Sequence, residues 1–189
     1  MEGGATPAAQ LTHIGLCVAD LDAMVEFYTR LLGMVVTDQG EFLGRHLAFL
    51  SRRASEHHQL VLVTGRNAER DVQLLSQLSF RLEDEDLGAL RWYQARALQL
   101  GAAGMEARNH GNTWSIYFHD PEGNRLEVYT ATPWYVRQPW RVPLDLAASD
   151  EEIRETTLQQ VEATAAAWSP VAEWKEQLEG RLTAREQVQ

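Results

Sequence analysis

Residues 109–130, Asn-His-Gly-Asn-Thr-Trp-Ser-Ile-Tyr-Phe-His-Asp-Pro-Glu-Gly-Asn-Arg-Leu-Glu-Val-Tyr-Thr, have the pattern of a β-hairpin. The segments before and after Asp120 alternate in polarity with period two, which is typical of strands that bury one face. Between them, the run Asp120-Pro121-Glu122-Gly123 has Asp, Pro and Gly at the positions that a type I turn prefers. Alternation puts Tyr117 and Glu127 on one face and the apolar residues on the other. The hairpin therefore predicts a phenol and a carboxylate on the same side of a sheet.

Length and composition limit what this hairpin can belong to. The chain has 189 residues, enough for one domain, or one domain with an appendage, around a buried core. Its net charge of −10, with no basic run, argues against nucleic acid and against an anionic membrane surface as partners. The single cysteine, Cys17, excludes an internal disulfide framework, and no apolar run approaches transmembrane length. Residues 1–10 lack the apolar core of a signal peptide and are expected to be a disordered tail, so a soluble cytoplasmic protein is expected.

Residues 11–65 predict one βαβββ unit. The segment from Leu11 to Val18 alternates as a strand does, with His13 on its polar face. Asp20 can cap a following helix, and Gly33 lies where a helix usually ends. Three short β-like runs follow, at residues 34–38, 46–51 and 58–63.

Residues 75–130 repeat that order. The alternation of residues 75–80 matches that of residues 11–16 and sets Gln77 in the place of His13. An acidic cap region at Asp84 and Asp86, a helix ending near Gly101 and three strand-like runs follow. The sequence therefore predicts an α+β fold built from two paired βαβββ modules.

Such modules must bury their apolar strand faces under the helices. The opposite faces are then free to curve toward each other and form a cup-shaped mixed sheet. His13 and Gln77, equivalent under the repeat, are expected to point into this cup with Tyr117 and Glu127. Arg81 and Arg125 share this parity; they can bind a substrate carboxylate or simply pair with acidic neighbours.

Residues 131–189 lie outside the repeat. They begin with a strap, residues 132–143, which is rich in proline and aromatic residues and is not expected to be helical. Ser149 to Glu152 form a capping box that opens one helix, and a second helix is expected after Pro170. This helical extension is expected to cover the mouth of the cup or to form a dimer contact. A helical pair packed on its own subunit, far from the site, is an equally compatible alternative.

Several motifs resemble the vicinal oxygen chelate superfamily, which includes glyoxalases, bleomycin resistance proteins and dioxygenases. They are Leu-Thr-His-Ile-Gly-Leu at residues 11–16, His-His-Gln-Leu-Val-Leu at residues 57–62, His110-Gly111 and the hairpin from Ser115 to Glu127. The resemblance covers roughly Leu11 to Thr130 and is strongest to the type I extradiol ring-cleavage dioxygenases.

The resemblance implies a metal site made by His13, Gln77 and Glu127, with Fe(II) as the usual ion. Gln77 stands where the dioxygenase pattern has a second imidazole. An amide oxygen is a weaker ligand for a divalent transition metal, so Mn, Ni, Zn or Co are open alternatives. Glyoxalase-like members of the superfamily do use a glutamine ligand.

The resemblance also implies three catalytic residues. His58 corresponds to the histidine beside the bound oxygen, His110 to an acid-base histidine, and Tyr117 to the tyrosine that hydrogen-bonds the substrate hydroxylate. Imidazoles titrate near neutrality and a phenol can donate to an oxyanion, so these residue types suit that chemistry.

The expected function is ring cleavage of a catechol-like aromatic with O2, and the chain is expected to form a homodimer. Two alternatives stay open. One is a non-oxygenase enzyme of the same superfamily, such as a glyoxalase-like isomerase, a lyase or an epimerase. The other is a metal-free small-molecule binding or resistance protein.

Overall fold

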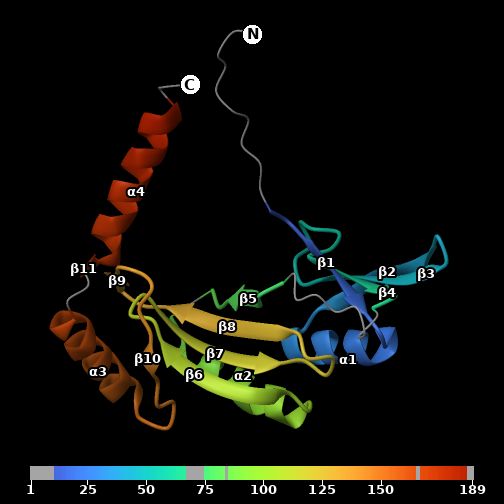
Figure 1. Ribbon diagram of the computed structural model, residues 1–189, viewed down its shortest axis with the longest axis horizontal. Coiled ribbons are helices and arrows are strands. Elements are labelled where there is room, and N and C mark those ends of the chain that lie inside the picture. The colour runs from blue at the N-terminus through green and yellow to red at the C-terminus, as the bar shows by residue number, and fades with distance from the viewer. Residues whose placement is uncertain (1–10, 67–74, 84, 165–166, 187–189) are drawn as a thin grey trace.

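The computed structural model describes residues 11–66, 75–83, 85–164 and 167–186 (Figure 1). The expected tail at residues 1–10 and Asp84 lie outside the described residues. The first module consists of β1 (Ile14–Val18), α1 (Leu21–Leu32), β2 (Val35–Phe42), β3 (Arg45–Ser51) and β4 (Leu60–Thr64). The second consists of β5 (Leu78–Arg81), α2 (Leu87–Gln99), β6 (Ala103–Asn109), β7 (Thr113–His119) and β8 (Arg125–Ala131).

The two modules have the same topology. The first sheet has the strand order β1-β4-β3-β2, and the second has the order β10-β6-β7-β8-β5, with β10 (Val142–Pro143) added at one edge. In each module the first strand pairs in parallel with the last, as β1 with β4 and β5 with β8, whereas the other pairs are antiparallel. The predicted alignment of His13 with Gln77 is confirmed, because each is the residue just before its module's first strand. The predicted α+β fold with two βαβββ modules is therefore confirmed.

Local sequence signals fix the ends of the two helices. The side chain of Asp20 accepts a hydrogen bond from Ala23 N at 3.0 Å, and that of Asp86 accepts one from Ala89 N at 2.9 Å. Both aspartates have extended backbone, as N-cap residues do. Gly33 ends α1 in the left-handed conformation, with φ of 63°.

The predicted hairpin is β7 and β8. Gly123 N donates to Asp120 O at 2.9 Å and closes the predicted turn. The Asp120 carboxylate also accepts from the backbone N–H groups of Glu122 and Asn124, at 3.0 and 2.8 Å. Tyr117 and Glu127 are directly opposite each other in the ladder, as alternation predicts.

The helices α1 and α2 lie side by side on one side of the sheets, and the apolar strand faces pack beneath them in one continuous core (Figure 1). Two polar contacts join the modules at this core. The Tyr28 hydroxyl on α1 donates to Asp120 at 2.9 Å, and both residues are buried. The Glu122 carboxylate accepts from the backbone of Ala19 and Asp20 at 2.7–3.0 Å. The turn of the hairpin therefore holds the start of α1.

The C-terminal extension starts with β9 (Trp134–Val136) and β10 and continues through α3 (Asp150–Ala163), β11 (Trp168–Pro170) and α4 (Val171–Glu186). The predicted capping box is present, with Ser149 and Glu152 exchanging hydrogen bonds. Trp114 Nε1 and Asn109 Nδ2 both donate to Thr157 of α3, at 2.9 and 3.1 Å. Since these two side chains leave the helix-covered face of the second sheet, α3 packs on its own subunit and does not cover the cup face.

The last helix, α4, projects away from the sheets (Figure 1). At its base, Trp174 stacks on Tyr135 with ring centroids 5.0 Å apart. None of the helices in the described part of the chain is long and apolar enough to cross a membrane.

Candidate active site

One row of polar side chains crosses the second sheet on the face turned away from α2. The strand register sets Glu106 beside Tyr117, Tyr117 beside Glu127, and Glu127 beside Ser79. Their neighbours Ile116, Phe118, Leu126 and Val128 point to the other face and are fully buried. Alternation along four adjacent strands therefore builds this row.

Glu127 is the centre of the row and is 8% exposed. Its Oε1 accepts from the Tyr117 hydroxyl at 2.6 Å, and its Oε2 accepts from Ser79 Oγ at 2.6 Å and Gln77 Nε2 at 2.8 Å. All three donors are neutral, and no cation among the described residues pairs with Glu127. A buried carboxylate held only by neutral donors is an environment that a divalent cation would neutralise.

Gln77 uses its amide nitrogen in this cluster, donating to both Glu127 and Ser79. Its amide oxygen accepts no hydrogen bond from any residue that the structure describes, so this oxygen is available as a ligand. The donor set thus fits a hard or borderline divalent metal, for which carboxylate and amide oxygens are suitable ligands.

His110 extends the row through Tyr117. Its Nε2 lies 2.9 Å from the Tyr117 hydroxyl, and its Nδ1 lies 3.0 Å from the backbone carbonyl of Trp140. A carbonyl oxygen can only accept, so Nδ1 carries a proton. The strap therefore fixes the orientation of the ring and leaves Nε2 to exchange a proton with Tyr117.

Tyr117 stands between a base and a carboxylate. Burial, followed by the hydrogen bond and charge of Glu127, raises the pKa of Tyr117 well above its usual value. The phenol is therefore neutral and keeps a proton that it can donate. Because this one proton has two partners, a second proton on either His110 or Glu127 is needed to complete both hydrogen bonds. The three side chains can thus pass a proton along the row.

A second cluster lies on the first sheet. The rings of His13 and His58 are 4.4 Å apart, and His58 Nδ1 is 2.9 Å from His57 Nδ1. His57 is anchored by Asp38 at 2.7 Å. Desolvation, then the charges of His13 and His57, lower the pKa of His58. Two imidazole rings this close together can serve as ligands of one metal ion.

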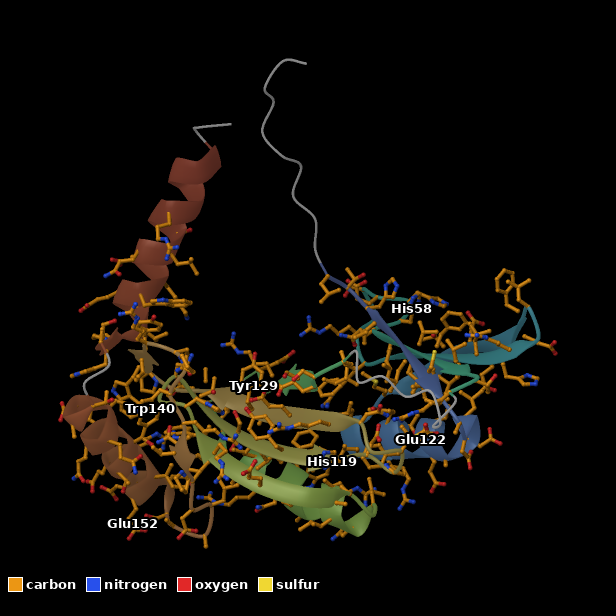
Figure 2. All side chains as sticks on the ribbon, viewed as in Figure 1. His58, His119, Glu122, Tyr129, Trp140 and Glu152 are labelled. Carbon is orange, nitrogen blue, oxygen red and sulfur yellow. The ribbon has the colours of Figure 1, made fainter. Side chains whose placement is uncertain are left out.

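The two clusters lie apart. Figure 2 shows His58 over the first sheet, separated from Tyr129 on β8 of the second. Within the described ranges, no three His, Cys, Asp or Glu side chains come together as a metal site. The structure thus brings Gln77, Glu127, Tyr117 and His110 together, and brings His13 to His58, but one chain does not join the two sets.

Sequence reasoning missed three members of the row around Glu127 and Tyr117. Ser79 has the same parity as Gln77 on β5, so strand alternation could have identified it. Trp140 contributes through its backbone, which leaves no signal in the sequence. Arg141 lies 5.6 Å from the Tyr117 ring and comes from the strap, where no periodicity was available to place it.

Both modules match a known protein family. The model of the Glyoxalase/Bleomycin resistance protein/Dioxygenase superfamily matches residues 10–128. The chain belongs to this superfamily. The matched residues cover the first module and the second as far as residue 128 in β8, so the strap and helices of the C-terminal extension lie outside the family match.

Proteins similar to this chain include a metallothiol transferase, a fosfomycin resistance protein and a glyoxalase. The metallothiol transferase FosB of Staphylococcus epidermidis is 28% identical over 127 residues, which cover 65% of this chain and 82% of that protein. The fosfomycin resistance protein FosX of Listeria monocytogenes, solved with Mn(II) and sulfate, is 19% identical with a TM-score of 0.52, over 67% of this chain and 95% of that one. The trypanothione-dependent glyoxalase I of Leishmania major is 17% identical with a TM-score of 0.54, over 90% of this chain and 98% of that one. At these identities the two structures show the shared fold.

These relatives bear on two of the predictions, the superfamily and the reaction type. The predicted membership of the superfamily is confirmed, but the particular closeness to extradiol dioxygenases is not supported. The relatives favour the non-oxygenase alternative over ring cleavage.

Proposed function

We propose that this protein is a metal-dependent, non-oxygenase enzyme of the vicinal oxygen chelate type, acting on a small molecule with adjacent oxygen atoms. The observation that carries the proposal is the buried Glu127 carboxylate with Tyr117 and His110 hydrogen-bonded in series behind it. The similarity to a metallothiol transferase, to a resistance protein solved with Mn(II) and to a glyoxalase supports it.

Glu127, Gln77 and His13 are the proposed metal ligands, with His58 beside His13. A bound divalent ion would polarise an oxygen of the substrate and stabilise negative charge that develops there. Carboxylate, amide and imidazole ligands accept several divalent ions, so Mn, Ni, Zn or Co are proposed alongside Fe(II).

The side chains of the chain itself supply proton transfer. Tyr117 is neutral and can donate a hydrogen bond to an oxyanion on the substrate. His110, held by the Trp140 carbonyl, can take up or return a proton through Tyr117. This arrangement suits isomerisation, elimination or addition next to a carbonyl or hydroxyl group.

We further propose that two copies of the chain complete one site. The support is that His13 and His58 lie on one sheet and Glu127 and Gln77 on the other, with no hydrogen bond between the two sets among the described residues. In a two-fold dimer, the first sheet of one copy can supply the imidazoles to the second sheet of its partner.

Mixing two inactive variants tests the two-copy site. His13→Ala and Glu127→Gln are each expected to be inactive as homodimers. Co-expression of the two should restore about a quarter of the wild-type activity, because half of the dimers are mixed and each contains one intact site. If the site is formed within one chain, the mixture stays inactive.

Substrate classes separate this function from its competitors. The proposal predicts turnover with one of two probes, fosfomycin plus a thiol or the hemithioacetal of methylglyoxal, after loading with Mn(II), Ni(II) or Zn(II). Oxygen uptake with catechols after anaerobic Fe(II) loading would instead identify a ring-cleaving dioxygenase. Ligand binding that persists in the His13→Ala and Glu127→Gln variants without metal would identify a binding protein.

A further inference from the structure

Three arginines surround one glutamate beside Tyr117. Glu106 pairs through Oε1 with Arg108 and through Oε2 with Arg141, and Arg125 lies 3.9 Å from the same Oε2. All four side chains are only partly exposed and leave the face of the sheet that carries Glu127. The candidate site thus has a cationic neighbour on its β6 side.

The charges in this group do not balance. Three guanidinium groups face the single carboxylate of Glu106, and one positive charge is left over even when the nearby Glu127 carboxylate is counted, in a chain whose net charge is −10. Like charges held this close repel one another, and a bound anion would reduce this repulsion. A local field opposite in sign to that of the whole protein also draws anionic ligands to this spot.

Arg125 is held in place without using its hydrogen-bond donors. Its guanidinium stacks on the Tyr117 ring, with Cζ 4.4 Å from the ring centroid. Within the described part of the chain it donates no hydrogen bond, and its one ion pair, with Glu106, is long. A planar guanidinium with free donors is the group that best recognises a carboxylate or phosphate-like oxyanion.

Arg141 reaches the same place from the strap. The β10–β6 pairing aligns Val142 with Asn109 and Pro143 with Arg108, which sets Arg141 in line with His110 on the cup face. Its Cζ lies 5.6 Å from the centroid of the Tyr117 ring, the same ring that Arg125 stacks on. The strap lies beyond the residues matched by the superfamily, so this arginine is an addition made by this chain's own C-terminal extension.

We propose that Arg125 and Arg141 form an oxyanion subsite for the substrate, next to the metal-binding end of the cup face. The ligand group is a carboxylate, phosphate or phosphonate. Arg125 precedes Glu127 by two residues on β8, so their Cα atoms are about 7 Å apart along the strand. The substrate is therefore a small molecule with vicinal oxygens at one end and an anionic group at the other. This assignment of substrate class rests on the proposed function, whereas anion binding itself can be measured without metal or turnover.

Calorimetric titration of the full-length, chelator-treated protein with two anionic probes tests the subsite. Benzoate is a planar monoanion and phenylphosphonate a tetrahedral anion, and neutral benzamide is the control ligand. Saturable binding of either anion with none of benzamide supports the subsite, and the tighter probe identifies the preferred anionic group. Absence of saturable binding for both anions overturns it.

Three variants assign the binding to these residues. Arg141→Met should weaken the tighter probe at least tenfold, and the matched control Arg137→Met, on the exposed side of the same strap, should leave it unchanged. Glu106→Gln removes the competing carboxylate and should tighten binding several-fold. Equal affinity in the wild type and the Arg141 variant, with both folded by circular dichroism, contradicts the proposal.

The competing role is that the arginines merely balance Glu106 within the sheet. In that case Glu106→Gln would lower the melting temperature without improving anion affinity. Metal affinity measured on the Arg141 variant separates the two proposals, because the metal ligands are untouched. Loss of anion binding with metal binding intact in the Arg141 variant supports the subsite. Absence of metal binding in the wild type overturns the proposed function and leaves the anion result unaffected.

Discussion

The Tyr117 hydroxyl donates a 2.6 Å hydrogen bond to Glu127, and the two residues are directly opposite each other on β7 and β8. This contact joins the proton-carrying part of the candidate site to its proposed metal-binding part. Glu127 keeps two further donors, Ser79 and Gln77, so the carboxylate stays in place when the tyrosine is changed.

Replacing Tyr117 by Phe therefore separates catalysis from metal binding. The variant loses the donor to a substrate oxyanion and the link to His110, and kcat/KM should fall by about 10²–10³-fold. Metal affinity, measured by calorimetry, should change little because the proposed ligands remain. A variant that loses metal affinity to the same degree as activity would show that Tyr117 acts only by supporting Glu127.

Removing Gln138 should loosen the orientation of His110. The Gln138 amide donates to the His110 carbonyl at 2.9 Å and its oxygen accepts from Trp140 N at 3.0 Å, so it ties the strap to the histidine. In the wild type, 15N spectra should show His110 protonated at Nδ1. In Gln138→Ala the ring should give an averaged signal of both tautomers. Identical His110 nitrogen shifts in the two proteins would mean that the strap does not orient the ring.

The hairpin part of the site was predictable because its causes are local. Alternation sets Tyr117 opposite Glu127, and the repeat sets Gln77 at the place equivalent to His13. Strand β2 extends to Phe42, beyond the predicted end at residue 38. The prediction stopped too early because β2 is exposed along its whole length, so the polar run from Thr37 to Glu41 has no apolar alternation that would indicate a strand.

The relative placement of the two sheets, and of the strap on the second sheet, was not predictable from the sequence. Whether His13 reaches Glu127 depends on how the two sheets are set by the contact of α1 with α2 and by the Tyr28–Asp120 hydrogen bond, which are long-range. Arg141 could not be placed either, because a single two-residue strand, β10, fixes it.

High pH should weaken the junction between the modules. Burial, then Asp120, raises the pKa of Tyr28 well above its usual value of about 10. The folded state then holds this proton more tightly than the unfolded state. The stability that it contributes is complete below pH 10 and is lost at about 1.4 kcal/mol per pH unit as the pH rises above 10.

Comparison of Tyr28→Phe with the wild type isolates this effect. Urea unfolding should show the variant less stable by about 1 kcal/mol at pH 8, because Asp120 loses one donor. The difference between the two proteins should shrink between pH 10 and 11. A difference that stays constant over this range would mean that Tyr28 does not titrate with unfolding.

Gly111 should tolerate no side chain. Its φ is 74°, and an added Cβ would lie 2.5 Å from Val136 Cγ2 and 3.1 Å from Val161 Cγ1. Gly111→Ala should destabilise the protein by about 2–3 kcal/mol. The matched control is Gly180→Ala in the exposed part of α4, where nothing lies within 4 Å, and it should be neutral or stabilising by up to about 1 kcal/mol. Equal unfolding midpoints for the two variants would contradict the packing of the strap and α3 on this turn.

Metal titration tests the central claim most directly. Calorimetric titration of the chelator-treated protein with Mn(II), Ni(II) or Zn(II) should show one ion bound per chain. Glu127→Gln and His13→Ala should each weaken binding by about 100-fold or more, since each removes a proposed ligand. Unchanged stoichiometry and affinity in the Glu127 variant would contradict the assignment of this carboxylate, and with it the proposed enzyme.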